Sequence, residues 1–327
     1  MSAPSAFLLD EQDGPAVENY LRSAGWLEPG EEFLDVKRAG QGNMNYVVRV
    51  RTGQRSFILK QSRPWVEKYP HIPAPWDRTL VEAEFYKTVQ HCDAVAASMP
   101  RLLGFDATAH VLQISDLGDS PTFEFLYAGE AFRPAELARL TAYLSNLHAT
   151  FRHQSLCDRF ANTDMRGLNH EHIFCLPFRS GNGLDLDSIT PGLANLAHRF
   201  QTDLALHKRV EALGKIYLGD GECLLHGDFF PGSWMRINDG VRIIDPEFCF
   251  FGRPEFDWGV LLAHLRLCHL PAELPASGSL NRSLLNGFAG VEMIRRLIGV
   301  AQLPLQYGLR EKELLLRQAQ DLLHAFA

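Results

Sequence analysis

Three carboxylates in the middle of the chain have the spacing that magnesium-dependent phosphoryl transfer needs. Asp228 stands in a His-Gly-Asp sequence just after the apolar residues 224–225, and Asp245 and Glu247 follow a second, mostly apolar run at residues 241–244. A strand that ends in a loop rich in Gly and Pro can deliver a carboxylate to a reacting group. Asp228 is therefore our candidate for the base that orients and deprotonates a hydroxyl nucleophile.

A predicted β-hairpin connects these carboxylates. Residues 234–237 and 241–244 are short runs around the turn signal Asn-Asp-Gly at residues 238–240. The hairpin would return Asp245 and Glu247 to the edge of the catalytic loop. Side chains two residues apart in an extended chain lie on one face, so both carboxylates could hold one divalent cation.

Magnesium is the cation that this donor set favours, because Mg²⁺ prefers oxygen ligands and usually takes one or two protein carboxylates. The six cysteines include no C-x-x-C pair, and the His-Glu-His sequence at residues 170–172 lacks the i, i+4 spacing of a helical zinc site. Each carboxylate alone is more often a turn residue. As a set, however, all three follow apolar runs that are predicted to be buried. A charge buried there costs free energy unless a metal or a charged partner offsets it.

These motifs resemble those of the aminoglycoside and choline kinase superfamily, which has the protein-kinase-like fold. Ser233 stands five residues after Asp228, where that superfamily usually has Asn, and this variant followed by Ile-Asp-Pro-Glu-Phe resembles the 5-methylthioribose kinases. The resemblance covers about residues 35–303. It implies an α+β bilobal fold, with an antiparallel β N-lobe at 1–117 and a mostly helical C-lobe at 118–327. Ser233 would join Asp245 and Glu247 at the metal.

The resemblance also implies nucleotide-binding residues in the N-lobe. Lys60, after an apolar run, would contact the α and β phosphates and be held there by Glu82, although the neighbouring Glu84 is an alternative partner. A solvated lysine and a surface glutamate are the plainer interpretations. The remaining candidates are a glycine-rich phosphate loop with Gly40, Gly42, Asn43 and Asn45, and a hinge whose backbone at Ser115 and Leu117 would meet adenine.

Two adjacent arginines, Arg295 and Arg296, resemble the twin-arginine helix of the same family and would bind acceptor hydroxyls or the transferring phosphoryl group. Neighbours on a helix point about 100° apart, so we expect at most one to face a given site. A solvated face beside Glu292 is the alternative. Asp257 is predicted to cap a helix and, by resemblance, to steady the catalytic loop, and His226 to pack and hydrogen-bond within that loop.

The hydrophobic pattern predicts the elements that must position these residues. Helices are expected at residues 14–28, from Pro134 onward, and as one long helix across residues 193–213. Alternating apolar residues around 35–50 and 57–59 predict an antiparallel sheet, and the proline-rich residues 64–75 a loop.

The composition fits a soluble enzyme of a reducing compartment. The chain has 327 residues and 46% hydrophobic content, enough for a sizeable core. Its formal net charge of −7 argues against a basic surface for nucleic acid. The sequence contains no apolar run of the roughly 18 residues that a membrane-spanning helix needs. Acidic residues and the absence of a basic, apolar leader at the N-terminus favour the cytoplasm. A homodimer is left open.

We therefore predict a kinase that uses ATP and Mg²⁺ to phosphorylate a hydroxyl of a small sugar-like acceptor. By resemblance, the first choice of acceptor is 5-methylthioribose, a substrate of methionine salvage. Another sugar, an amino alcohol or an aminoglycoside is the alternative, because residues 269–286 form a shorter connection than in the 5-methylthioribose kinases. A nucleotide-binding regulator without turnover is a second alternative, since a fold does not prove an activity.

Overall fold

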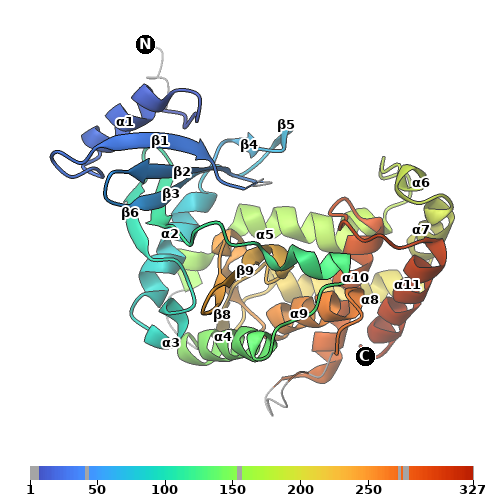
Figure 1. The fold of residues 1–327 in the computed structure, drawn as a ribbon. Coiled ribbons are helices and arrows are strands. Elements are labelled where there is room, and N and C mark those ends of the chain that lie inside the picture. The colour runs from blue at the N-terminus through green and yellow to red at the C-terminus, as the bar shows by residue number, and fades with distance from the viewer. Residues whose placement is uncertain (1–6, 41–43, 153–156, 272–273, 275–279, 327) are drawn as a thin grey trace. The chain divides into compact units, whose positions relative to one another are not determined.

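The structure is a computed structural model that describes residues 7–40, 44–152, 157–271, 274 and 280–326. The packing of the backbone divides the chain into unit 1, Met1–Asp119, and unit 2, Ser120–Ala327. Unit 1 carries the predicted antiparallel sheet and unit 2 is mostly helical (Figure 1). The expected α+β fold is therefore confirmed.

The sheet of unit 1 is antiparallel throughout, in the order β1-β2-β3-β7-β6. Alternating side chains such as Val48 and Val50 of β2 are fully buried, which is the expected pattern for a strand with one face on a core. The strands and helices of this unit are α1 (Gly14–Ser23), β1 (Phe33–Arg38), β2 (Tyr46–Thr52), β3 (Ser56–Gln61), β4 (Trp65–Val66), β5 (Tyr69–Pro73), α2 (Arg78–Val89), α3 (Asp93–Ala96), β6 (Leu102–Asp106) and β7 (Val111–Ser115).

The proline-rich segment of unit 1 is not only a loop. Its strands β4 and β5 pair with each other and stay outside the larger sheet. Proline lacks an N–H donor and is tolerated in such short edge strands. The predicted loop is therefore interrupted by a short strand pair, and no helix lies within residues 64–75.

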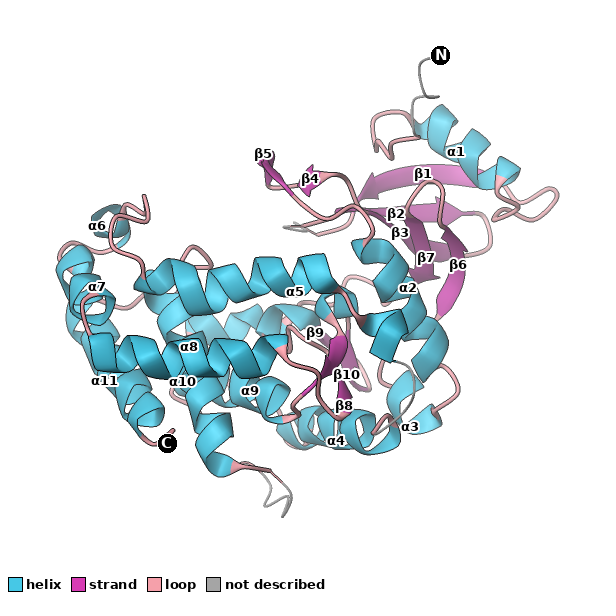
Figure 2. Cartoon of the chain, turned by 180° about the vertical axis from the view of Figure 1, so that it is seen from behind, coloured by secondary structure: helices cyan, strands magenta, loops and turns pink. Residues whose placement is uncertain are grey.

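Helices dominate unit 2 (Figure 2). Asp203 ends the predicted long helix early, since its carboxylate accepts from the N–H groups of Ala205 and Leu206 and starts a second helix. The long-helix prediction was therefore wrong. The helices are α4 (Glu136–Thr150), α5 (Thr163–His170), α6 (Leu186–Ile189), α7 (Leu193–Gln201), α8 (Leu204–Leu218), α9 (Glu255–Leu267), α10 (Arg282–Ile298) and α11 (Leu309–His324), with a π-helix at Glu171–Cys175 and 3₁₀ turns at Phe123–Ala128, Cys157–Phe160, Leu176–Phe178, Pro231–Ser233 and Pro246–Phe248.

Two short antiparallel strand pairs carry the carboxylates of unit 2. Strand β8 (Cys223–Leu225) pairs with β11 (Phe250–Gly252), and β9 (Trp234–Ile237) pairs with β10 (Gly240–Ile243) through the predicted hairpin turn. The hairpin is thus confirmed. Helix α10 packs against α9 and α11, where Gly290 permits close approach: a Cβ there would lie 2.7 Å from the carbonyl oxygen of Ala319.

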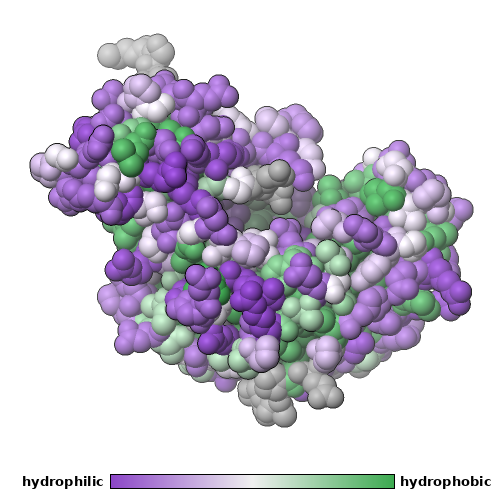
Figure 3. All heavy atoms as spheres, in the orientation of Figure 1, coloured by the Kyte–Doolittle hydropathy of each residue, from purple (hydrophilic) through white to green (hydrophobic). Residues whose placement is uncertain are grey.

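Hydrophilic residues dominate the visible surface of both units (Figure 3). Large exposed apolar side chains such as Leu204 and Leu34 are scattered singly along the described chain, as is normal for a protein surface. None of the helices in the described ranges is both long and apolar enough to span a membrane.

Candidate active site

The loop that carries Asp228 is held by a buried carboxylate from α9. Asp257 is fully buried and accepts hydrogen bonds from the N–H of His226 (2.8 Å), the N–H of Gly227 (3.0 Å) and Nε2 of His148 (3.0 Å). The predicted role of Asp257 in steadying the loop is confirmed. The predicted helix cap was wrong, because α9 begins at Glu255 and Asp257 is its third residue, which frees the carboxylate for the loop.

His226 and Gly227 fix the loop immediately before Asp228. Nε2 of His226 donates to the carbonyl of Ile244 at 3.0 Å, and its Nδ1 accepts from the N–H of Asp228 at 3.4 Å, so the ring packs and hydrogen-bonds as predicted. Gly227 has a φ of +84°, and a Cβ there would lie 2.0 Å from the carbonyl oxygen of Phe248. Only glycine fits this position.

The Asp228 carboxylate lies beside both arginines of α10. Its Oδ1 is 3.6 Å from Nη2 of Arg296 and 4.0 Å from Nη1 of Arg295, and 18% of the side chain stays exposed. Burial raises the pKa of Asp228 to about 6, against the opposing effect of the two guanidinium groups. A partly enclosed carboxylate of raised basicity can accept the proton of an alcohol.

Glu292 brings the two guanidinium groups together. Its Oε1 accepts from Nε of Arg296 at 2.6 Å and its Oε2 from Nη1 of Arg295 at 3.1 Å, and all three side chains are buried. The expectation that only one arginine faces a given site was wrong, because long side chains can converge from positions about 100° apart. The alternative of a solvated face is excluded by burial.

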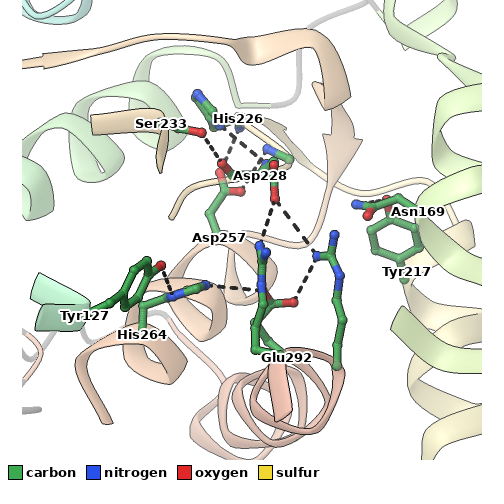
Figure 4. Close-up of polar contacts among 12 residues, drawn as sticks. Tyr127, Asn169, Tyr217, His226, Asp228, Ser233, Asp257, His264 and Glu292 are labelled. Atoms are coloured by element: carbon green, nitrogen blue, oxygen red, sulfur yellow. Dashed lines mark hydrogen bonds and ion pairs between the residues drawn. The ribbon is translucent and has the colours of Figure 1, made fainter. Parts of the chain in front are cut away.

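Glu292 is a site residue that was not predicted from the sequence, although its i, i+3 and i, i+4 spacing to the arginines indicates such pairs. His264 was not predicted either. Its Nε2 lies 3.3 Å from Oε1 of Glu292, and its Nδ1 lies 2.9 Å from the hydroxyl of Tyr127. Figure 4 shows Tyr127 and His264 on one side of this cluster, and Asn169 hydrogen-bonded to Tyr217 at 3.2 Å on the other. No local sequence pattern signals these partners.

His264 makes the stability of the protein depend on pH. Burial lowers the pKa of His264 to about 4, whereas an unfolded histidine titrates near 6.5. The unfolded chain therefore binds a proton below pH 6.5 that this histidine does not bind in the folded chain, and the contribution of His264 to stability falls as the pH falls from 6.5 toward 4. Asp228 has the opposite effect in this range, because its raised pKa lets the folded chain bind a proton there. Between pH 6.5 and 5 this histidine should lower the free energy of unfolding by about 2 kcal/mol.

The check is urea denaturation of the wild type and of His264→Gln at both pH values. The glutamine amide keeps a donor for Glu292 and does not titrate, whereas the contribution of Asp228 is common to both proteins. On going from pH 6.5 to 5, the free energy of unfolding of the variant should therefore change by about 2 kcal/mol less toward instability than that of the wild type. Equal changes in the two proteins would contradict the assignment of a neutral His264.

The three proposed metal ligands surround the end of the hairpin. Asp245 has a φ of +60° and is followed by the 3₁₀ turn Pro246–Phe248, so the predicted extended geometry of Asp245 and Glu247 was wrong. Left-handed backbone is uncommon for residues other than glycine and is found at functional sites. The hydroxyl of Ser233 donates to the main-chain carbonyl of Asp228 at 2.9 Å.

Asp245, Glu247 and Ser233 offer only oxygen donors, the type of ligand that Mg²⁺ prefers. The carboxylate of Glu247 contributes to raising the pKa of Asp228, and the main-chain carbonyl of Glu247 accepts from Nδ2 of Asn162 at 2.9 Å. Among the described residues, no group of three or more His, Cys, Asp or Glu side chains could hold a metal. Two carboxylates leave the remaining ligand positions to phosphate and water, as Mg²⁺ prefers.

In unit 1, Lys60 pairs with Glu82 in the core. Nζ of Lys60 lies 2.8 Å from Oε2 of Glu82, and the side chains are 3% and 0% exposed. Glu84, the alternative partner, instead accepts from the hydroxyl of Thr88 at 3.4 Å. The preferred pairing is confirmed, and a solvated lysine is excluded.

The described end of the glycine-rich loop is anchored by Arg78 of α2. Its guanidinium donates to Oδ1 of Asn45 at 2.8 Å and to the carbonyl of Met44 at 2.7 Å. Gly40 has a φ of +70°, which suits glycine. The predicted residues Gly42 and Asn43 lie outside the described residues.

The predicted hinge follows strand β7. The N–H of Ser115 donates to the carbonyl of Arg101 at 2.9 Å, and Asp116 pairs with Nε of Arg49 at 2.8 Å while accepting from the N–H of Gly118 at 2.9 Å. These contacts fix the backbone on both sides of Leu117. Adenine binding at Ser115 and Leu117 stays a prediction.

Comparison with known proteins decides the family. The model of a family described as the phosphotransferase enzyme family matches residues 35–289. The chain belongs to this family. All of the predicted site residues except Arg295 and Arg296 fall within the matched range.

Relatives of this phosphotransferase carry a more specific name. The chain is 26% identical over 265 residues to a methylthioribose kinase of Exiguobacterium sibiricum, which covers 78% of this chain and 66% of that protein. A methylthioribose kinase of Pectobacterium carotovorum is 29% identical over 273 residues, covering 79% of this chain and 66% of that protein. The chain thus spans about two thirds of the length of the curated relatives it matches.

Solved structures of other phosphotransferases share the fold. LicA in complex with AMP superposes with a TM-score of 0.53 at 13% identity, over 96% of this chain and 99% of that chain. Spectinomycin phosphotransferase in complex with ADP and spectinomycin superposes with a TM-score of 0.54 at 11% identity, over 98% of this chain and 99% of that chain. At these identities the likeness establishes the fold alone.

Proposed function

We propose that this phosphotransferase transfers the γ-phosphoryl group of ATP to a hydroxyl of a small, sugar-like acceptor. The observation that carries the proposal is the Asp228 carboxylate, held on a fixed loop by Asp257 and placed 3.6 Å and 4.0 Å from two guanidinium groups. This combination supplies a base for the hydroxyl and positive charge for the transferring group.

Each predicted residue has a role in this reaction. Asp228 accepts the acceptor proton, and Arg295 and Arg296 bind acceptor hydroxyls or the phosphoryl oxygens. Lys60, held by Glu82, binds phosphate oxygens of the nucleotide. The other nucleotide-binding candidates are Gly40, Gly42, Asn43, Asn45, Ser115 and Leu117. Residues 1–117 would thus form the nucleotide-binding lobe and residues 118–327 the lobe that carries the base.

Magnesium would be held by Asp245 and Glu247, with Ser233 as a further oxygen donor. When bound, this ion neutralises phosphate charge. The left-handed backbone at Asp245 supports its role, because this conformation is costly for residues other than glycine and is found at functional sites.

The acceptor that we propose first is 5-methylthioribose, supported by the names of the relatives. A neutral sugar also suits the site. Arg295 and Arg296, next to Asp228, can only donate hydrogen bonds, which suits the hydroxyl oxygens of a sugar better than the ammonium groups of choline or an aminoglycoside. Another neutral sugar is the second candidate.

The test is magnesium-dependent ADP release with 5-methylthioribose, ribose, choline and one aminoglycoside. Turnover with 5-methylthioribose supports the full proposal, and turnover with ribose alone keeps the reaction and replaces the acceptor. Preference for a cationic acceptor would refute the argument from the two arginines. ATP binding without ADP release on any acceptor would favour the regulatory alternative.

Loss of a metal-binding carboxylate should appear as a higher requirement for magnesium. In Asp245→Asn and Glu247→Gln, we expect the Mg²⁺ concentration for half-maximal ADP release to rise by at least about 10-fold, because each removes a charged ligand. The control is Asp239→Asn, which alters an exposed carboxylate in the turn of the same hairpin. A magnesium requirement equal to that of the control would remove the residue from the metal site.

A further inference from the structure

A buried series of hydrogen bonds ends on the two arginines beside Asp228. It runs from Tyr127 in the 3₁₀ turn Phe123–Ala128, through His264 of α9, to Glu292 of α10 (Figure 4). We propose that Tyr127, His264 and Glu292 are positioning residues, which hold the guanidinium groups of Arg295 and Arg296 in the orientation that the reaction needs. The inference rests on the proposed function of the arginines.

The direction of each hydrogen bond is determined by the chemistry of the groups. Glu292 has a pKa well below its usual value because Arg296 and Arg295 overcome the cost of burial, so its carboxylate is ionised and can only accept. Nε2 of His264, at 3.3 Å, must therefore be the donor. In a neutral ring this leaves Nδ1 as an acceptor, and the hydroxyl of Tyr127 donates to it at 2.9 Å.

The arrangement fixes Arg296 from three sides. Its Nε donates to Glu292 at 2.6 Å, the ring of Phe230 lies 4.5 Å from the guanidinium carbon, and Nη2 points to Asp228 at 3.6 Å. A guanidinium is planar, so a carboxylate at one edge and an aromatic ring on one face leave it little rotation. Because Phe230 belongs to the same loop as Asp228, its contact with Arg296 also fixes the position of the guanidinium relative to the Asp228 carboxylate.

Stability alone is a weak reason for this cluster. Tyr127, His264 and Glu292 are 3%, 1% and 1% exposed, and burying such polar groups costs about as much as their pairing returns. The contacts of Glu292 also differ from those of an ordinary buried ion pair, of which Glu136 and Arg236 are an example in unit 2. Glu136 directs both oxygens to one guanidinium, that of Arg236, whereas Glu292 divides its oxygens between two.

Glu292→Gln tests the centre of the series. The amide keeps the shape but replaces one acceptor oxygen with a donor, which would face a guanidinium and release it. We expect kcat/KM for the acceptor to fall about 100-fold, since small misplacements of reacting groups have effects of this size. The KM for ATP should change much less, by no more than about threefold, because the arginines are proposed to contact only the acceptor and the γ-phosphoryl group, whereas Lys60 and the other candidates of residues 1–117 would hold the rest of the nucleotide.

Tyr127→Phe tests the far end. It removes only the hydroxyl that donates to His264, so we expect a smaller loss of about fivefold in acceptor kcat/KM. Glu292→Asp, which keeps the charge on a shorter side chain, should recover part of the activity that Glu292→Gln loses.

The matched control is Glu136→Gln. Glu136 is 4% exposed and bonds Arg236 at 2.8 Å and 2.9 Å, so the substitution removes a buried charge of the same kind elsewhere in unit 2. It should lower the melting temperature as Glu292→Gln does, with unchanged kinetics. Equal kinetics for Glu136→Gln and Glu292→Gln, with wild-type turnover intact, would overturn the inference.

A second measurement does not depend on turnover. In ¹⁵N-resolved NMR spectra, the Nε–H of Arg296 should exchange slowly in the wild type and in Glu136→Gln, and rapidly in Glu292→Gln. An Nε–H signal that is unaffected by Glu292→Gln would refute positioning. If the wild type releases no ADP with any acceptor while this signal responds as expected, the proposed function fails and the contact stands.

Discussion

Asp228→Asn should lower the rate of phosphoryl transfer by between about 100- and 10,000-fold, the usual contribution of a general base. The amide is nearly the same shape as the carboxylate, and the contacts of Asp257 with the N–H groups of His226 and Gly227 do not involve the Asp228 side chain. The loop should therefore keep its geometry. What is lost is the group that accepts the hydroxyl proton.

Steady-state ADP release and ATP binding by calorimetry, measured together, give the decisive comparison. ATP affinity should stay within about threefold of the wild type, because Asp228 is proposed to act on the acceptor. Asp239→Asn, in the exposed hairpin turn, is the matched control and should turn over normally. Turnover of Asp228→Asn at the level of this control would exclude Asp228 as the base and with it the proposed mechanism.

Lys60→Met should both weaken ATP binding and destabilise the protein. Lys60 and Glu82 are 3% and 0% exposed, with Nζ and Oε2 at 2.8 Å, so removing the ammonium leaves the Glu82 charge buried beside an apolar side chain. Breaking a buried ion pair in this way costs about 3–5 kcal/mol. Loss of the cation proposed to bind phosphate oxygens should raise the Kd for ATP by at least about 10-fold.

A double variant separates these two effects. Lys60→Met with Glu82→Leu replaces both charges by apolar groups of similar size, which restores most of the stability of a buried pair. ATP affinity should stay low. If the double variant regained ATP binding together with stability, Lys60 would be a structural residue, and the nucleotide-binding role would be refuted. Glu84→Gln is the control, since Glu84 contacts Thr88 and leaves the Lys60–Glu82 pair intact.

The sequence predicted the elements whose signals are local. The alternation of apolar residues in β2 and β3 and the Asn-Asp-Gly turn between β9 and β10 depend on residues close in the chain, and both are present in the structure. The pairing of Lys60 with Glu82 was predicted from the family resemblance, because position on the helix alone did not distinguish Glu82 from Glu84. Helix boundaries were less accurate, since the carboxylate of Asp203 ended a hydrophobic pattern that continued through it.

Tertiary structure alone decided how the Asp228 carboxylate meets the two arginines and which groups lie behind Glu292. Tyr127, His264 and Glu292 come from segments 137 and 28 residues apart, and their hydrogen bonds follow from how α9 and α10 pack. Asp245 has a left-handed backbone and not the extended one that the sequence predicted. Asp257 holds a loop 30 residues away in the chain. A sequence pattern predicts which side of its own helix or strand a residue faces, but not which other element packs against that side. Whether a buried charge finds its partner depends on which elements the whole chain brings together, because burial without that partner is too costly to persist.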